Sequence, residues 1–100
     1  MNDSHILSDD DRYLAMLGDR VRGERSRRGM TRKILSNYSK VSERYLAQLE
    51  SGRGNVSIIL LRQIAAAMHV PLAELVQDGP DQPVEMALIL EQLADLSVGD

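Results

Sequence analysis

Apolar residues recur at spacings of three or four residues in several stretches of this chain. Such spacing places apolar side chains on one face of a helix and leaves the other faces for polar residues. The stripes are Tyr13, Leu14, Leu17 and Val21; Leu46 and Leu49; Leu61, Ile64, Ala65 and Met68; and Met86, Ile89 or Leu90, Leu93 and Leu96. Each stripe predicts one amphipathic helix.

Residues with capping ability mark the ends of these helices. A hydroxyl directly before a helix can accept a hydrogen bond from an unsatisfied amide of the first turn. The expected N-caps of this kind are Ser8, Thr31, Ser42 and Ser57. Gly29, Gly52 and His69 are expected to end helices, because these residue types tolerate a left-handed backbone. Helices are therefore predicted over residues 9–28, 42–51, 58–68 and 72–77, with one further short helix after Thr31.

Length and composition limit the chain to one modest core. The 100 residues are 43% hydrophobic and include neither Phe nor Trp. A core of Leu, Ile, Val and Met suits helices better than sheets, so the predicted fold class is all-α. We expect a flexible arm over residues 1–8, a helical domain over 9–77, a linker over 78–83 and a helix over 84–100. That last helix is expected to fold back on the domain, to pair with a second copy or to join a further domain.

The net charge of −3 conceals a segregation of charge. Residues 19–53 hold ten basic side chains and four acidic ones, whereas residues 1–18 and 54–100 carry net charges of −3 and −6. A basic middle between acidic ends can meet a polyanion with one face. The arginines of the predicted first helix, Arg20, Arg22, Arg27 and Arg28, are expected either to form a solvated face or to face phosphates.

The stretch from Thr31 to Asn55 predicts two short helices joined by the polar turn Ser39-Lys40-Val41. The second helix buries its Leu stripe, which leaves Glu43, Arg44, Tyr45 and Gln48 to face outward. This arrangement is typical of a helix-turn-helix, in which the second helix reads DNA. A solvated face is the alternative interpretation of the same residues.

Residues 17–76 resemble the DNA-binding domain of the Xre/Cro/C1-type family. The residues that carry the resemblance are Leu17 to Arg22, Arg25, Arg28 to Thr31, Ile34, Leu35, Val41, Ser42, Leu46, Leu49 to Arg53, Asn55, Ser57, Ile58, Leu61, Ile64, Ala65, Met68 and Leu72. The resemblance implies a compact, lambda-repressor-like five-helix bundle. The chain departs from the family pattern at Lys40, where Gly is usual, at Arg32, where Gln is usual, and at Ile59 and Leu60, where polar residues are usual.

Residues 42–68 resemble more narrowly the benzoyl-CoA-responsive regulators of aromatic catabolism, which carry a C-terminal shikimate-kinase-like domain. That resemblance implies a fragment whose effector, an aromatic acyl-CoA, binds a domain absent from this chain. No G-x-x-x-x-G-K sequence for a phosphate-binding loop is present.

The family resemblance implies a sequence-specific regulator of transcription, expected to be a repressor, that places residues 42–51 in the major groove. Arg44 would read guanine, Gln48 would read adenine, and Glu43 would accept from cytosine or orient Arg44. The expected phosphate contacts are Arg32, Lys33, Ser42, Tyr45, Arg53 and Asn55. Arg25 and Glu50 are expected to form a structural ion pair, as in the family.

Double-stranded DNA and a second copy of the chain are the expected partners, because one helix reads only a few base pairs. The apolar residues expected to form the dimer or partner surface are Ile59, Leu60, Met86, Leu90 and Leu93. An alternative is a protein-interaction module in which the same bundle binds a toxin or a polymerase subunit.

No combination of residues in the sequence is typical of an active site. The chain has no Cys and two widely separated His residues, so we expect no enzyme activity, no metal and no cofactor. The lack of Cys suits a reducing compartment, and no apolar run is long enough to span a bilayer. We therefore expect a cytoplasmic protein without membrane contact.

Overall fold

The computed structural model describes residues 8–78, which form five α-helices and no β-strand. The helices are α1 (Asp9–Arg27), α2 (Arg32–Ser39), α3 (Glu43–Glu50), α4 (Ile58–Met68) and α5 (Leu72–Val76). The predicted all-α fold with five helices is confirmed for this part of the chain. The predicted arm before Ser8, the linker beyond Asp78 and the predicted helix over 84–100, with Met86, Leu90 and Leu93, lie outside the described residues.

The predicted capping residues begin and end the helices as expected. The hydroxyl oxygens accept from amides three residues on: Ser8 from Asp11, Thr31 from Ile34, Ser42 from Tyr45 and Ser57 from Leu60. Gly29 and His69 follow α1 and α4 with left-handed φ angles of 66° and 57°. The fifth helix ends at Val76 rather than at Gln77. Local side-chain chemistry therefore fixes most helix boundaries in this domain.

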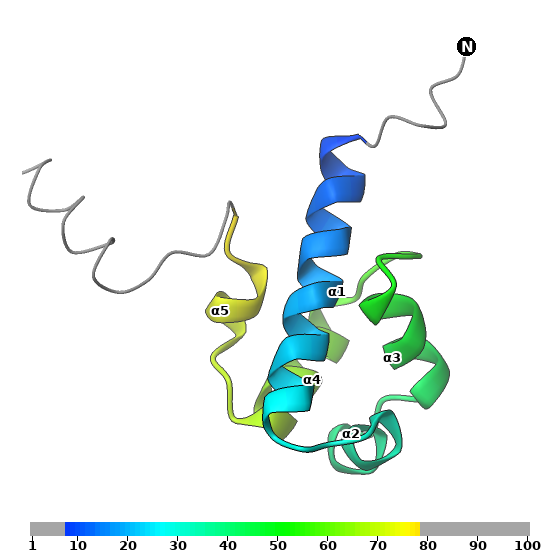
Figure 1. The fold of residues 1–100 in the computed structure, drawn as a ribbon, viewed down its shortest axis with the longest axis vertical. Coiled ribbons are helices and arrows are strands. Elements are labelled where there is room, and N and C mark those ends of the chain that lie inside the picture. Colours follow the sequence, from blue (N-terminus) through cyan, green and yellow to red (C-terminus); the bar gives the residue numbers. More distant parts are fainter. Residues whose placement is uncertain (1–7, 79–100) are drawn as a thin grey trace, which may run out of the picture.

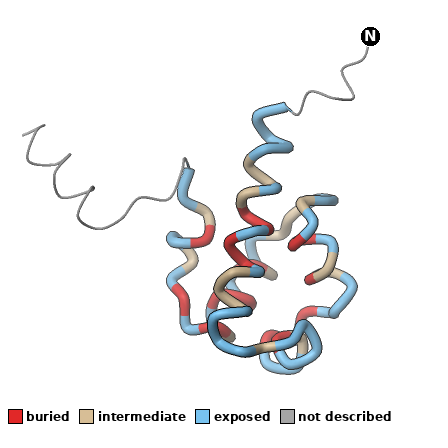
Figure 2. The backbone as a smooth tube through the Cα atoms, in the orientation of Figure 1, coloured by how far each residue is buried: buried red, intermediate tan, exposed pale blue. Residues whose placement is uncertain are grey.

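α1 is the longest of the described helices and lies between α5 and α3 (Figure 1). It contacts α3 on one side and α5 on the other, while α4 packs against α2 and α5. The buried segments of all five helices face a shared interior (Figure 2). The core residues are Leu17, Val21, Leu35, Val41, Leu46, Leu49, Leu61, Ile64, Ala65, Met68, Val70 and Leu75.

The contact between α1 and α3 depends on Gly18. A Cβ atom at this position would lie 2.4 Å from the Leu49 carbonyl oxygen and 2.8 Å from that of Glu50. Those distances are shorter than van der Waals contact, and both atoms belong to the backbone. The absence of a side chain at Gly18 therefore lets the last turn of α3 lie directly against α1.

Two α1 side chains hold the carboxyl end of α5. The Tyr13 hydroxyl donates to the Val76 carbonyl, and Arg20 Nη1 donates to the carbonyls of Leu75 at 3.0 Å and Gln77 at 2.6 Å. These carbonyls lie in the last turn of a helix, where no intrahelical amide reaches them. Arg20 is buried, so its predicted place on an outer, solvated or phosphate-facing side of the first helix is wrong.

Candidate nucleic-acid interface

The turn between α2 and α3 is held by short-range contacts. The Ser39 side chain is buried, and its Oγ accepts from the Val41 amide at 3.2 Å. Lys40 adopts the left-handed conformation, with φ 65° and ψ 20°, and its amide donates to the Ser36 carbonyl. The turn thus has the left-handed backbone that glycine usually supplies, although it costs a lysine about 1 kcal/mol or more.

The predicted base-reading residues share the outward side of α3. Glu43, Arg44 and Gln48 are exposed, whereas Leu46 and Leu49 on the opposite side are buried. None of the three outward side chains forms an ion pair within residues 8–78, so Glu43 does not orient Arg44 in this structure. Their side chains are available to meet the edges of base pairs.

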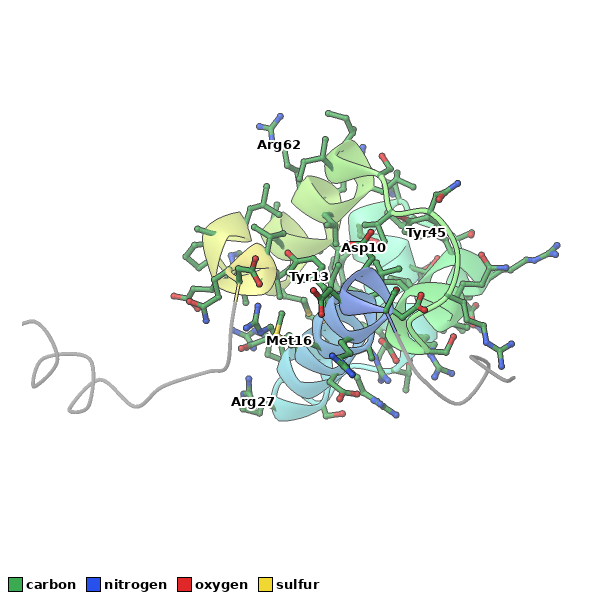
Figure 3. The ribbon with its side chains drawn as sticks, turned by 90° about the horizontal axis from the view of Figure 1, so that it is seen from above. Asp10, Tyr13, Met16, Arg27, Tyr45 and Arg62 are labelled. Carbon is green, nitrogen blue, oxygen red and sulfur yellow. The ribbon has the colours of Figure 1, made fainter. Side chains whose placement is uncertain are left out.

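Tyr45 does not face outward as predicted. It is half-buried against the core, and its hydroxyl accepts from the Ser57 amide at 2.9 Å (Figure 3). Tyr45 follows Arg44 in α3, but its aromatic ring fits between this helix and the start of α4. The side chain therefore fixes the spacing between α3 and α4, and only its hydroxyl proton remains for a phosphate.

The other predicted phosphate contacts lie on exposed backbone next to α3. Lys33 on α2, Ser42 before α3, and Arg53 and Asn55 after it are exposed. The Arg53 amide donates to the Gln48 carbonyl at 2.9 Å, and Gly52 and Gly54 have φ angles of 75° and 78°. The loop leaves α3 by a tight turn and places Arg53 beside the end of that helix.

The structure contains the Arg25–Glu50 pair and adds a third member. Arg25 Nε lies 2.7 Å from Glu50 Oε2, and Arg25 Nη2 lies 2.9 Å from Oε1. Arg32 Nε lies 3.1 Å from the same Oε1. The hydrogen bonds from Arg25 to Glu50 raise the pKa of Arg25 further above its usual value. Arg32 was predicted to contact only phosphate, but in the structure it also binds the buried carboxylate of Glu50.

The remaining arginines on the outer face of α1, and Arg28 just after it, are paired with acids of α1. Arg22 binds Asp19 at 2.7 Å, and both Arg27 and Arg28 bind Glu24 at 2.5 Å. Burial would raise the pKa of Glu24, but the hydrogen bonds from Arg28 and Arg27 outweigh it and lower that pKa. In contrast, Lys33, Lys40, Arg44 and Arg53 have no acidic partner among residues 8–78. Exposed cations without an acidic partner among residues 8–78 therefore lie on α2, in the turn after it, on α3 and in the loop after α3, and Arg62 on α4 is one more.

The fold and this surface agree with the comparison with known families. A family model described as helix-turn-helix matches residues 21–75, which run from the second half of α1 into α5. The chain belongs to the Xre/Cro/C1-type helix-turn-helix family. The match includes α2, the turn at Lys40 and α3, so the helix-turn-helix is the one predicted from Thr31 to Asn55.

Relatives of this helix-turn-helix chain are transcriptional regulators. It is 34% identical over 67 residues to the transcriptional regulator ClgR of Mycobacterium tuberculosis, a match that covers 67% of this chain and 60% of ClgR. It is 32% identical over 68 residues to the uncharacterized HTH-type transcriptional regulator y4dJ of Sinorhizobium fredii, covering 68% of this chain and 88% of that protein. The chain spans less than two thirds of ClgR.

A solved structure shares the fold. The restriction-modification controller protein C.AhdI from Aeromonas hydrophila superposes with a TM-score of 0.60 at 29% identity, over 62% of this chain and 94% of that one.

The predicted apolar surface on α4 is only partly correct. Ile59 is 54% exposed as expected, but Leu60 is half-buried and packs against the core. Ile58, which was not among the residues predicted for this surface, is 55% exposed. Arg62 projects outward from the same helix (Figure 3). The exposed apolar pair is therefore Ile58 and Ile59 at the amino end of α4.

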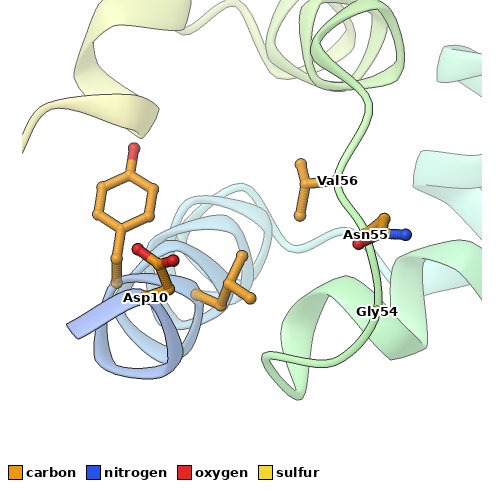
Figure 4. Close-up of a pocket in the computed structure, with 6 residues that line it drawn as sticks. Asp10, Gly54, Asn55 and Val56 are labelled. Atoms are coloured by element: carbon orange, nitrogen blue, oxygen red, sulfur yellow. The ribbon is translucent and has the colours of Figure 1, made fainter. Parts of the chain in front are cut away.

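An open cleft of about 290 Å³ lies between the start of α1 and the loop before α4 (Figure 4). Its walls are Asp10, Tyr13 and Leu14 on one side and Gly54, Asn55 and Val56 on the other. No group of three or more metal-ligating side chains occurs among residues 8–78, and no helix there is long and apolar enough to cross a membrane. Asp10 supplies the one carboxylate among the residues that line the cleft.

Proposed function

We propose that this domain binds duplex DNA and regulates transcription, with α3 in the major groove. The observation that carries the proposal is the set of exposed cations without acidic partners among residues 8–78 on α2, α3 and the segments that flank α3: Lys33, Lys40, Arg44 and Arg53. Cations without acidic partners can release counterions from a phosphate backbone, which is the main source of affinity for DNA. The names of the relatives, transcriptional regulators of the same family, support it.

Within this proposal the side chains divide by their place on the surface. Arg44 and Gln48 occupy neighbouring turns of the exposed α3 face and would bind guanine and adenine edges, with Glu43 beside them accepting from cytosine. Lys33 on α2, Ser42 before α3, and Arg53 and Asn55 after it are exposed and would bind phosphates. Arg32 and the hydroxyl of Tyr45 would join them while keeping their internal contacts.

The first test is an equilibrium titration of the protein with duplex DNA at several salt concentrations. Sites selected from random duplexes should bind more tightly than scrambled ones by a factor of about 10³ or more. The logarithm of the association constant should fall linearly with the logarithm of salt concentration. Binding that is absent, or that does not depend on salt, would refute the proposal.

We also propose that the protein acts as a homodimer, with Ile58 and Ile59 of α4 in the contact. Ile58 and Ile59 are consecutive exposed apolar residues at the amino end of α4, and exposed apolar surface can serve as an interaction site. Two copies would read half-sites roughly 34 Å apart. Sedimentation with and without a selected site should detect the dimer, and Ile59→Lys should abolish it without changing the fold. A monomer in both conditions would contradict this.

The exposed Ile58 and Ile59 also favour the alternative function, a module that binds another protein. In that case a partner, such as a toxin or a polymerase subunit, would cover α4. Ile59→Lys would then leave both the DNA affinity and the oligomeric state of this protein unchanged. The two functions are thus separated by the same variant.

The narrower resemblance of residues 42–68 supports a more specific proposal. The protein would act in the cytoplasm as a repressor of aromatic catabolism, released from DNA by an aromatic acyl-CoA that binds a shikimate-kinase-like domain outside residues 1–100. Benzoyl-CoA should then weaken DNA binding by a protein that carries that domain and should leave residues 1–100 unaffected. A response by residues 1–100 alone would show that the effector binds elsewhere.

A further inference from the structure

The cluster of Arg25, Glu50 and Arg32 runs from the interior to the surface. The Glu50 side chain is 0% exposed, that of Arg25 is 13% exposed and that of Arg32 is 45% exposed. Glu50 Oε1 accepts from both arginines, at 2.9 Å from Arg25 Nη2 and 3.1 Å from Arg32 Nε. One buried carboxylate therefore holds two guanidinium groups in fixed positions.

The two arginines use their nitrogens differently. Arg25 donates from Nε and Nη2 to Glu50 and from Nη1 to the Met30 carbonyl at 2.8 Å, so all three of its nitrogens have acceptors. Arg32 donates only from Nε, and its two Nη groups have no acceptor among residues 8–78. Arg25 alone satisfies the charge of Glu50, so the cluster keeps one surplus positive charge at its exposed end.

Arg32 is the first residue of α2. Amides at the start of a helix favour anions nearby. A guanidinium that is held by Nε and keeps both Nη groups is oriented to bind a phosphate oxygen pair. An arginine held in this way loses less conformational entropy on binding than one that moves freely.

We propose that Glu50 is a positioning residue for DNA binding, holding the guanidinium of Arg32 in the orientation that binds a backbone phosphate. The inference rests on the proposed function, and it assigns Glu50 a role beyond the stability of the fold. Arg32 is the contact, and Glu50 acts through it. The direction in which one substitution, Glu50→Gln, changes the affinity for DNA distinguishes this role from a purely electrostatic effect.

Glu50→Gln removes a negative charge beneath the DNA-binding surface. Electrostatics alone would then strengthen binding to DNA. Loss of positioning would instead weaken it, by about two- to tenfold, because Arg32 must be ordered when the complex forms. The salt dependence should stay nearly constant, since Arg32 keeps its charge.

The experiment is a double-mutant cycle on DNA affinity, with Glu50→Gln and Arg32→Ala alone and combined. Arg32→Ala should weaken binding and lower the salt slope by about one unit. In the Arg32→Ala background, Glu50→Gln should cause no further loss. An equal loss in both backgrounds would show that Glu50 is only structural and would overturn the inference. Circular dichroism at the titration temperature checks that each variant is folded.

Arg32→Lys keeps the test decisive if Glu50→Gln does not fold. Lysine retains the charge but cannot bind the carboxylate and a phosphate through separate nitrogens of a planar group. Binding should weaken by about two- to tenfold with an unchanged salt slope. Wild-type affinity for this variant would overturn the inference. If Arg53→Ala weakens DNA binding while Arg32→Ala does not, the inference about Glu50 fails and the proposed function stands. If the wild-type protein does not bind DNA, the proposed function itself fails.

Discussion

α1 and the α2–α3 unit are both rich in basic residues, but they use them in opposite ways. All five arginines of α1 have partners: Arg12, Arg22 and Arg27 bind acids of the same helix, Arg20 binds carbonyls and Arg25 binds Glu50. Lys33 on α2 and Arg44 on α3 have none among residues 8–78. The number of arginines therefore does not by itself indicate a surface for a polyanion, because the arginines of α1 are already bound within the protein.

The cause of the difference can be read from local spacing. Asp9, Asp19 and Glu24 stand three residues before Arg12, Arg22 and Arg27, at the distance where side chains meet on a helix. No acid stands three or four residues from Lys33 or Arg44. The net charge of residues 19–53 thus combines a partly neutralised set of arginines in and just after α1, where Arg27 and Arg28 share Glu24, with cations on the helix-turn-helix that have no acidic partner among residues 8–78.

The largest effect is expected where the two regions are joined, at Glu50. Glu50→Ala should leave Arg25 mostly buried without its carboxylate and lower the free energy of unfolding by about 3–5 kcal/mol. Urea denaturation measures the change. Arg22→Ala, which breaks an exposed pair on α1, is the control and should cost less than about 1 kcal/mol. Similar losses for the two variants would mean that burial does not distinguish them.

Arg44→Ala should remove a base contact from the unpaired surface. The loss on a selected DNA site should be about 1–3 kcal/mol, with reduced discrimination at one base pair and little change on scrambled DNA. Titrations of both duplexes measure the two affinities. If both fall equally, Arg44 binds phosphate and does not read a base.

Arg53→Ala should act on all duplexes alike. Losing one phosphate contact should lower the salt slope by about one unit and weaken selected and scrambled sites by a similar factor. Arg22→Ala removes the same charge from α1, where Asp19 already neutralises it, so its slope should not change. An equal effect of the two variants would show that pairing in α1 does not keep its arginines from DNA.

Lys40→Gly tests the cost of a side chain in the turn between α2 and α3. Because Lys40 has φ 65°, glycine should relieve strain and raise the free energy of unfolding by about 0.5–1 kcal/mol. The matched control is Lys33→Gly, within α2, which should lower stability by about 1 kcal/mol. Thermal melts that show the same sign for both variants would contradict the assigned strain.

The smallest effect is expected for the acidic partner on α1. The pKa of Glu24 is lowered in the folded state below its ordinary value of 4.5, so its pairs stabilise the fold above that pH. The contribution is lost as pH falls through the lowered pKa. Glu24→Gln should therefore be less stable than wild type at pH 7, by under about 1 kcal/mol, with the difference shrinking toward pH 3. A constant difference in urea denaturation would exclude ionisation as the cause.

The sequence alone determined the features that depend on a few neighbouring residues. The N-caps at Ser8, Thr31, Ser42 and Ser57, and the outward place of Arg44 and Gln48 opposite Leu46 and Leu49, follow from hydrogen bonds and periodicity within one or two turns. The pairs of Arg22 with Asp19 and of Arg27 and Arg28 with Glu24 could also have been predicted from their i, i+3 and i, i+4 spacing. They would have removed these three arginines from the candidates for phosphate contact.

Tertiary structure alone decided the contacts between residues far apart in the chain. Arg20 meets Leu75, Tyr45 meets Ser57 and Arg32 meets Glu50 only because of how α1 packs on α5, α3 on the start of α4, and α2 on α3. The close approach of α1 and α3 depends in turn on Gly18. The sequence pattern around a basic or aromatic residue is the same whether its side chain is solvated or binds a carbonyl group far away in the chain. The exposure of Ile58 and the burial of Leu60 were settled in the same way, by where the neighbouring helices lie.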